Sequence, residues 1–254
     1  MIRAPIPRLA PGERRLDGAV ARYLVRVLRL RAGDPFVAFD PATGREADAV
    51  TVSAGHDAIT VRFGAPREGA VRAARAITWI QGLTRGDKCD AVVRDATELA
   101  ATRVIVARTR RSVVALDAAR AAERQARWTR IAQEAARQCG RSDPPVVDAP
   151  CPWDEALARV PPDASRFCLW ERATEPLGPP LFEALARGVP LAFACGPEGG
   201  LDDGEAEHAR AGGWTIASLG AIALRTETVA AAVLGAVRVW TGAFDVPAGD
   251  APRL

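Results

Sequence analysis

Two short loops hold most of the residues whose types and spacing could do chemistry. The first is the turn Gly-Pro-Glu-Gly-Gly at residues 196–200, which follows an apolar run ending at Cys195. Its glycines let the backbone bend sharply and approach a ligand closely, although such a turn also serves as a packing device. Its carboxylate, Glu198, could accept a proton or could cap the loop. The turn is not GxGxxG, which disfavours a dinucleotide-binding fold.

The second loop covers residues 218–228 and carries one cation, Arg225, among apolar residues. Its backbone could hydrogen-bond a flat heterocycle while Ile222 and Leu224 pack against the ring. Thr-Glu-Thr then opens a long Ala-rich helix, where Thr226 or Thr228 could equally be a helix cap. The pattern indicates a loop able to hold a flat ligand at the start of a helix.

The sequence lacks the residues that several other kinds of active site or metal site require. The chain has two histidines, and no Walker A, HExxH or GxSxG motif occurs. The cysteines are widely spaced without a CxxC pair, which favours free thiols in a reducing compartment over a disulfide framework or a metal site. They are Cys89, Cys139, Cys151, Cys168 and Cys195. We expect no metal.

The two loops need a scaffold, and short apolar runs from residue 76 onward predict one. Runs of strand length alternate with helical stretches, the pattern of an α/β domain with a mainly parallel sheet. The runs lie at residues 77–80, 103–106, 167–170, 191–194 and 215–217. Ligands sit at the carboxyl ends of such strands, so binding loops are expected after Trp170, Ala194 and Ala217. Asp202 and Glu205 have the spacing of a capping box, which predicts a helix there.

Residues 1–70 show a different pattern, that of a small β-rich unit. Short runs of β-forming residues alternate with turn residues. The predicted elements are a helix at 22–30, strands at 35–39, 47–53 and 58–63, and a linker at 65–69. The N-terminal unit should therefore fold separately from the α/β part.

Positive charge is concentrated near the N-terminus. Residues 1–31 hold 8 Arg against 2 acidic residues, whereas the whole chain has a net charge of only +3. Arg suits phosphate, so this end could touch nucleic acid. The alternative is a GC-rich genome that encodes Arg everywhere, since Lys88 is the sole lysine. A helix is also expected at 121–139, with Trp128 and Ile131 on its buried face and arginines on a solvated or substrate-facing surface.

Composition indicates a soluble globular protein, with 48% hydrophobic and 26% charged residues. No window approaches the roughly 18 apolar residues of a membrane span. The N-terminal residues lack the apolar core of a signal peptide. We therefore expect a cytoplasmic protein without a membrane partner.

Ordered motifs along nearly the whole chain resemble the RsmE family of the SPOUT superfamily, which methylates N3 of a uridine in 16S ribosomal RNA. The two loops match C-terminal motifs of that family, and upstream segments match its earlier motifs in the expected order. The upstream segments are Arg26-Val27-Leu28-Arg29, Gly33-Asp34, Gly86-Asp87-Lys88, Ala96-Thr97-Glu98-Leu99, Arg111-Ser112-Val113 and residues 134–141.

The resemblance implies a PUA-like, RNA-binding β-barrel over residues 1–70 and a trefoil-knotted SPOUT methyltransferase domain over residues 74–247. It also implies a homodimer, S-adenosylmethionine as cofactor, and 16S rRNA or the small ribosomal subunit as partner. Carried over by position, the cofactor-binding residues are Leu169, Trp170, Glu171, Cys195, Gly196, Pro197, Glu198, Gly199, Gly200, Ser218, Leu219, Gly220, Ala223, Leu224, Arg225 and Thr226.

Several positions depart from the family's pattern. Asp95 stands where the family usually has a Lys, and Ile222 lies where an Arg is expected near the cofactor. Val229 replaces an Ala, and a His expected before the first motif is absent around residues 22–23. These departures bear on RNA contacts more than on the cofactor fold.

Methyl transfer to uracil N3 makes a specific demand on the site. Positioning supplies on the order of 7–11 kcal/mol, but N3 is a poor nucleophile until its weakly acidic proton leaves. A cation beside O2 or O4 would stabilise the anion as it forms, and we expect Arg225 to provide it. Glu198 is the candidate proton acceptor, with loop capping as its alternative role. The expected RNA-binding residues are Arg26, Arg29, Arg111 and Arg141.

Two other functions stay open. A SPOUT relative could methylate a ribose 2′-oxygen or a different base. Asp95 and Ile222 also leave room for an RNA-binding ribosome-assembly factor that has lost catalysis. Binding of S-adenosylmethionine would separate that factor from an enzyme.

Overall fold

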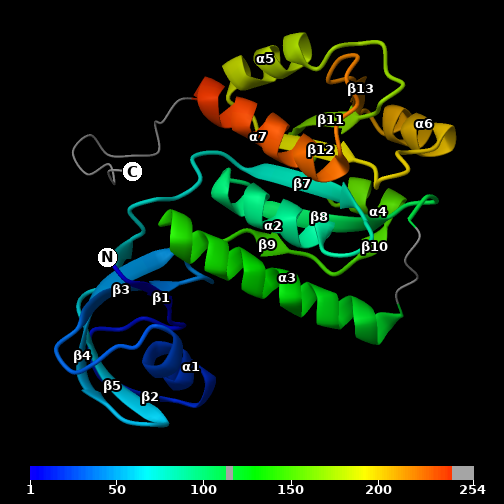
Figure 1. Ribbon diagram of the computed structural model, residues 1–254. Coiled ribbons are helices and arrows are strands. Elements are labelled where there is room, and N and C mark those ends of the chain that lie inside the picture. The colour runs from blue at the N-terminus through cyan, green and yellow to red at the C-terminus, as the bar shows by residue number, and fades with distance from the viewer. Residues whose placement is uncertain (113–116, 242–254) are drawn as a thin grey trace. The chain divides into compact units, whose positions relative to one another are not determined.

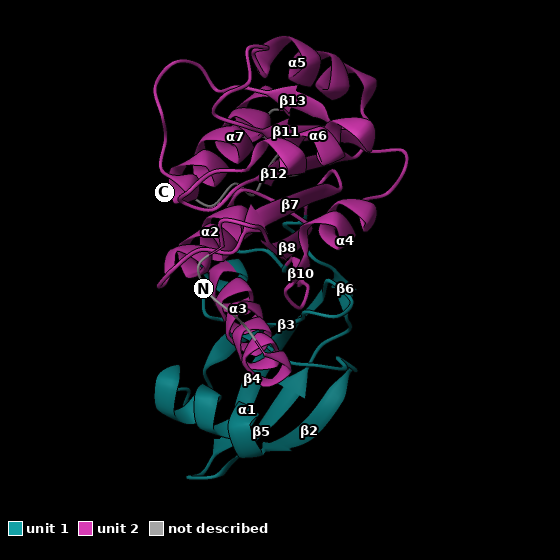
Figure 2. Ribbon diagram, turned by 90° about the vertical axis from the view of Figure 1, so that its right-hand side faces the viewer, with its two compact units in different colours: residues 1–72, 136–144, 246–254 teal, residues 73–135, 145–245 magenta. Residues whose placement is uncertain are grey.

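The computed structural model describes residues 1–112 and 117–241 and divides into two compact units (Figures 1 and 2). Unit 1 contains residues 1–72 and 136–144, and unit 2 holds the other described residues. The chain leaves unit 1 after residue 72 and returns to it over residues 136–144, a return that was not predicted. The domain bounds 1–70 and 74–247 stay a prediction. Val113 and the predicted domain end at 247 lie outside the described residues.

Unit 1 is built on a six-stranded sheet in the order β1-β3-β4-β5-β2, with β6 paired to β4. All neighbours are antiparallel except β1 and β3. The strands are β1 (Arg3–Pro5), β2 (Gly12–Asp17), β3 (Pro35–Asp40), β4 (Arg45–Ala54), β5 (Ala58–Phe63) and β6 (Arg67–Glu68). The three predicted strands are confirmed as β3, β4 and β5. The other three are short or highly charged, so they show no apolar alternation.

The helix expected at residues 22–30 begins earlier and is divided. Helix α1 spans Gly18–Arg22 and continues as a π-helical segment, η1 (Tyr23–Val27). The amide of Leu28 accordingly donates to the carbonyl of Tyr23, 3.0 Å away and five residues back. This wider turn changes the spacing at which apolar side chains return to the core. The predicted helix therefore began and ended a few residues too late.

Unit 2 is built on a seven-stranded sheet in the order β10-β8-β7-β12-β11-β13, with β9 paired to β8. Every pairing in this sheet is parallel. The strands are β7 (Ile77–Gly82), β8 (Arg103–Arg108), β9 (Val146–Val147), β10 (Cys151–Pro152), β11 (Ser165–Leu169), β12 (Leu191–Cys195) and β13 (Thr215–Ala217). The five predicted strands of the α/β part are all present.

Helices cover both faces of this sheet (Figure 1). On one face, side chains of α2, α3, α5 and α7 form a core with Trp79 and Phe193, while α4 and α6 pack on the other face with Ile80 and Ile105. The helices are α2 (Lys88–Glu98), α3 (Ala118–Cys139), α4 (Trp153–Ala158), α5 (Gly178–Arg187), α6 (Asp203–Ala211) and α7 (Thr226–Thr241). The predicted buried face of α3 is confirmed at Trp128.

The register of the sheet brings the three expected loops to one level. Leu169, at the end of β11, pairs with Cys195 at the end of β12 and with Ala217 at the end of β13. The loops that follow these strands therefore begin side by side at the carboxyl edge. Within residues 1–112 and 117–241, no helix is both long and apolar enough to cross a membrane.

Candidate active site

The three loops enclose a cavity of about 590 Å³ in unit 2. All sixteen residues expected to bind the cofactor line it. The cavity wall further includes Lys88, Ala217, Ala221, Ile222, Glu227 and Val229. The strand pattern predicted the three loops at this edge of the sheet, and the resemblance to the RsmE family supplied the sixteen residues. That these residues bind the cofactor stays a prediction. No group of His, Cys, Asp and Glu suited to a metal occurs among the described residues.

The first loop, residues 196–200, is held in a tight turn. Gly200 has a φ of +70°, and the amide of Gly200 donates to the carbonyl of Pro197 at 2.9 Å. A Cβ on Gly196 would lie 2.7 Å from the carbonyl carbon of Gly200, so no larger residue fits there. The predicted capping box is confirmed, because the Asp202 carboxylate accepts from the amide of Glu205 at 2.7 Å. These contacts fix the backbone that faces the cavity.

The second loop is anchored at both ends and open between them. The amide of Leu177 donates to the carbonyl of Ser218 at 2.9 Å, and Thr226 is buried at the start of α7. Between these anchors the side chains are exposed, including Ile222 with 81% of its surface accessible. Arg225 is also exposed, and its guanidinium has no hydrogen-bond or ion-pair partner among the described residues. A cation at the cavity wall is therefore available to a ligand.

Glu198 forms an ion pair with Lys88. The Lys88 Nζ lies 3.1 Å from Glu198 Oε1, which also accepts from the amide of Arg85 at 3.1 Å. Partial burial raises the pKa of Glu198, but these partners and its own backbone amide outweigh burial, so the net pKa is lowered. Glu198 is thus a carboxylate at neutral pH and a weak proton acceptor. Its contacts connect the first loop to the start of α2.

Sequence reasoning missed Lys88 and Glu227 as residues of the cavity wall. The motif containing Lys88 was noted without a role, and its being the sole lysine was the available signal. Glu227 lies in the first turn of α7, and its Oε2 is buried without a hydrogen-bond partner in the described structure. An unsatisfied buried acceptor costs free energy, so this oxygen is suited to a donor or cation on a ligand.

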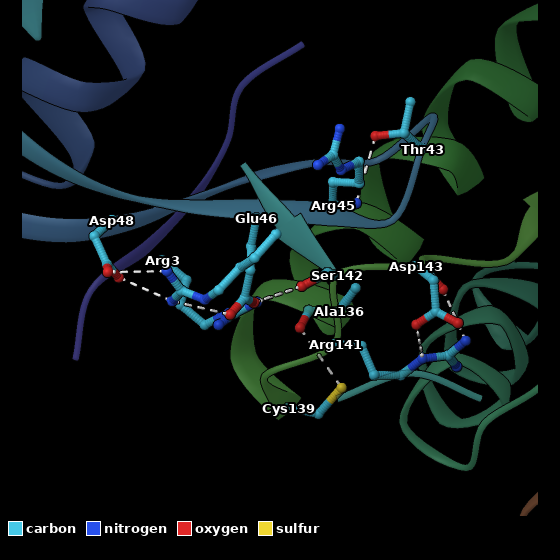
Figure 3. A network of polar contacts seen from close by, with 11 residues as sticks. Arg3, Thr43, Arg45, Glu46, Asp48, Ala136, Cys139, Arg141, Ser142 and Asp143 are labelled. Atoms are coloured by element: carbon cyan, nitrogen blue, oxygen red, sulfur yellow. Dashed lines mark hydrogen bonds and ion pairs between the residues drawn. The ribbon is translucent and has the colours of Figure 1, made fainter. Parts of the chain in front are cut away.

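The arginines expected to contact RNA occupy different environments. Arg26 and Arg29 are exposed on unit 1, and Arg29 has a φ of +57°. Arg111, in unit 2, donates to the carbonyl of Gly199 at 2.7 Å and so braces the first loop. Arg141 is only 2% exposed, and its guanidinium donates to the Asp143 carboxylate at 3.1 Å (Figure 3). This placement corrects the expectation that Arg141 grips RNA.

Two of the three departures from the family pattern lie at the cavity and one does not. Asp95 lies on α2, paired with Arg94 at 2.9 Å, and is not part of the cavity wall. Ile222 and Val229 do line the cavity. Of the three, the exposed Ile222 changes the chemistry of the wall, because an apolar side chain stands where a cation was expected.

Comparison with known proteins identifies both units. Residues 72–238 match the model of the RNA methyltransferase domain, and residues 16–64 match that of the RNA methyltransferase PUA domain. The chain is 31% identical over 240 residues to a ribosomal RNA small subunit methyltransferase E of Mycobacterium bovis, covering 92% of this chain and 89% of the relative. The Bacillus subtilis protein of that name is 29% identical over 234 residues, covering 89% of this chain and 90% of the relative.

A solved structure is similar to this chain over most of its length. The ribosomal RNA small subunit methyltransferase E of Neisseria gonorrhoeae, bound to S-adenosylmethionine, superposes with a TM-score of 0.84 and 27% identity, over 94% of this chain and 98% of that one. The predicted fold class, a SPOUT-type parallel α/β domain with an N-terminal PUA-like domain, is confirmed, while its trefoil knot stays a prediction. The chain belongs to the ribosomal RNA small subunit methyltransferase E family.

Proposed function

We propose that this enzyme transfers a methyl group from S-adenosylmethionine to N3 of a uridine in 16S ribosomal RNA. One observation carries the proposal: three loops from distant parts of the sequence form a single cavity, and its wall contains a cation, Arg225, with no partner among the described residues. A cavity of this size suits a small-molecule cofactor. Substrate RNA would approach the exposed second loop.

The residues present fit S-adenosylmethionine. Backbone groups of residues 196–200 and 218–220 offer donors and acceptors to a heterocycle, and Leu169 and Leu219 add apolar walls. The Glu227 oxygen that has no partner in the described structure can accept a hydrogen bond from an ammonium or a hydroxyl, and its negative charge attracts a sulfonium. When bound, the cofactor supplies an electrophilic methyl group. Because this methyl group is already reactive, the protein has to orient the two reactants and to stabilise the charge that develops.

Arg225 has the role of stabilising charge on the uracil. The N3 proton leaves to solvent water at the exposed second loop, which places negative charge on O2 and O4, and a guanidinium can donate to such an oxygen. Arg225 has no ion-pair partner within the described structure, so its guanidinium can bind the uracil without first breaking an ion pair. Glu198, with its lowered pKa and its bond to Lys88, serves to position the first loop.

Two further features support an RNA partner and a dimer. The PUA-like unit 1 exposes Arg26 and Arg29, whose guanidinium groups suit phosphate. On unit 2, α5 and α7 expose Phe182 and Trp240, whose rings lie 5.6 Å apart edge to face. Exposed aromatic patches mark interaction surfaces, and we assign this one to a second copy of the chain. An enzyme that modifies ribosomal RNA belongs in the cytoplasm.

Transfer from tritiated S-adenosylmethionine tests the proposal. The purified enzyme should label 16S RNA from cells that lack this gene, either as free RNA or in the small subunit. RNA from cells that retain the gene should accept little label, because its site is already methylated. Failure to bind the cofactor in calorimetry, together with no labelling of either form, would contradict the proposal and favour an inactive assembly factor.

A further inference from the structure

Directly behind the cavity wall lies a buried amide that belongs to neither loop. Gln81, near the end of β7, has no exposed surface and pairs in register with Cys195 of β12. It is not among the residues that line the cavity. A glutamine inside a parallel strand must find hydrogen-bond partners for its amide, because the neighbouring positions are apolar.

The partners of Gln81 fix the orientation of its amide. The indole Nε1 of Trp79 lies 3.2 Å from Gln81 Oε1, and an indole N–H can only donate. The Cys195 thiol donates to the same oxygen at 3.4 Å. The amide nitrogen must therefore point the other way, toward the two loops.

The nitrogen of this amide joins the two loops of the cavity. Gln81 Nε2 donates to Thr226 Oγ1 at 2.8 Å, and its second N–H is shared between the carbonyls of Gly196, at 3.2 Å, and of Gly82 in its own strand, at 3.1 Å. Thr226 Oγ1 in turn donates to the Gly196 carbonyl at 2.7 Å. Gly196 begins the first loop and Thr226 lies near the end of the second, so one amide reaches both. Both residues line the cavity.

The end of β7 packs tightly against the first loop. A Cβ on Gly82 would lie 2.4 Å from the amide nitrogen of Pro197, so the end of β7 packs directly against the first loop. This contact fixes the first loop against β7, and the Gln81 amide, carried by the same strand, connects that loop to Thr226 of the second.

We propose that Gln81 is a positioning residue: its amide N–H groups hold the first and second loops at the separation that binds the cofactor. The inference rests on the proposed function, since it concerns affinity for S-adenosylmethionine. The alternative role, a buried hydrogen bond that stabilises unit 2 without affecting the site, predicts loss of stability alone. The two roles predict different affinities for S-adenosylmethionine when the side chain at position 81 loses its hydrogen-bond donors, because only the positioning role needs donation to the loops.

Gln81→Glu is the informative variant because it keeps the shape of the side chain. An ionised carboxylate can accept from Trp79 but cannot donate to the Gly196 carbonyl. A protonated carboxyl regains one donor, and burial favours the protonated form. The titratable group in contact with this position is the Cys195 thiol, whose pKa burial raises to about 12, so it stays neutral below pH 9. No charged side chain in the described structure contacts the amide.

Calorimetric titration with S-adenosylmethionine at pH 6 and pH 8.5 tests the proposal, read as the ratio of variant to wild-type dissociation constants. For Gln81→Glu we expect a ratio of roughly ten at pH 8.5 that falls severalfold at pH 6. For Gln81→Met, which has no donor, the ratio should be high and equal at both pH values. Thr97→Val is the matched control. It removes a buried hydrogen bond of 2.7 Å within α2, away from the cavity, and its ratio should stay near one.

Ratios near one for both Gln81 variants would overturn the inference. Should either variant fail to fold, Thr226→Val and Thr226→Ser test the same hydrogen bonds among Gln81, Gly196 and Thr226. The inference requires weaker binding for Val and restored binding for Ser, which keeps the hydroxyl. If the wild-type protein itself binds no S-adenosylmethionine, the proposed function fails instead, so the two failures are distinguishable.

Discussion

At the scale of single residues, the charged groups of the cavity differ in what already binds them. Glu198 is held by Lys88, and its lowered pKa keeps it ionised. Arg225 has no partner among the described residues, and one oxygen of Glu227 is buried without a donor. Groups with unused hydrogen-bonding capacity are the ones a ligand can engage, so Arg225 and Glu227 are the residues to test in binding and turnover.

Arg225→Ala should lower kcat by roughly 10²–10³-fold, as is usual when one donor to a developing anion is removed. Affinity for S-adenosylmethionine should change far less, because the loop backbones remain. Single-turnover methylation of 16S RNA, with calorimetry for the cofactor, measures both quantities. Arg225→Lys serves as the control that keeps the charge and should retain part of the activity. Unchanged turnover in Arg225→Ala would remove the assignment.

How far the sequence could predict the site depends on the kind of interaction. The three loops were predictable because parallel strands that end in register must place their following loops together. The Lys88–Glu198 pair was not, since it joins residues far apart in the sequence whose contact depends on how α2 packs. Gln81 was hidden within an apolar strand, and the burial of Arg141 cannot be deduced from charge counts.

At the scale of elements, unit 1 is held by a buried polar network between β4 and the segment 136–144 (Figure 3). Glu46 Oε2 accepts from Arg3 at 3.0 Å and from the Ser142 hydroxyl at 2.9 Å. Burial raises the pKa of Glu46, but the bonds from Arg3 and Ser142 and the charge of Arg67 outweigh it, so the net pKa is lowered. The segment 136–144 is therefore tied to the sheet by a group that must stay ionised.

Glu46→Gln should destabilise unit 1 by about 3 kcal/mol at pH 7, because Arg3 loses its buried carboxylate partner. A lowered folded-state pKa stabilises the fold above the unfolded value near 4.5, and this stabilisation is lost as pH falls through the folded value. Stability of the variant should accordingly depend less on pH in the acid range. Hydrogen exchange of the amides in β3, β4 and β5 at pH 7 and pH 4 measures both effects.

Glu13→Gln is the matched control, since Glu13 forms an exposed pair with Arg62 on the same sheet. Exposed pairs contribute at most about 1 kcal/mol, so exchange in this variant should resemble that of the wild type. Equal protection in Glu46→Gln and Glu13→Gln would show that the buried network does not stabilise the unit.

At the scale of the whole molecule, unit 1 has the chemistry to grip RNA and unit 2 has the cavity for methyl transfer. Arg26→Ala with Arg29→Ala should weaken RNA binding without changing cofactor affinity. If both arginines contact phosphate, the slope of log K against log salt should fall by about 1.4 on single-stranded RNA. Arg26 lies 3.7 Å from Asp57, whereas Arg62 is held by Glu13 at 2.6 Å, so Arg62→Ala should leave the slope nearly unchanged. Equal slopes in all three proteins would exclude these arginines from the RNA contact.

The aromatic patch of α5 and α7 makes its own prediction about assembly. Trp240 is 65% exposed and Phe182 is 57% exposed. Exposing this apolar surface to water costs free energy, and packing against a second copy of the chain would remove that cost. Trp240→Glu should convert a dimer into a monomer in sedimentation velocity experiments while leaving the fold intact by circular dichroism. Val52→Glu, a comparable substitution of a half-exposed apolar residue in unit 1, should not. A wild-type protein that sediments as a monomer would contradict the assignment.

The identity of the methylated nucleoside tests the central claim most directly. 16S RNA from cells lacking the gene should be incubated with the enzyme and S-adenosylmethionine, digested to nucleosides and analysed by mass spectrometry against authentic standards. We predict 3-methyluridine as the sole new product, formed by the wild type and greatly reduced with Arg225→Ala. A ribose 2′-O-methylated nucleoside, or a methyl group on a different base, would contradict the claim.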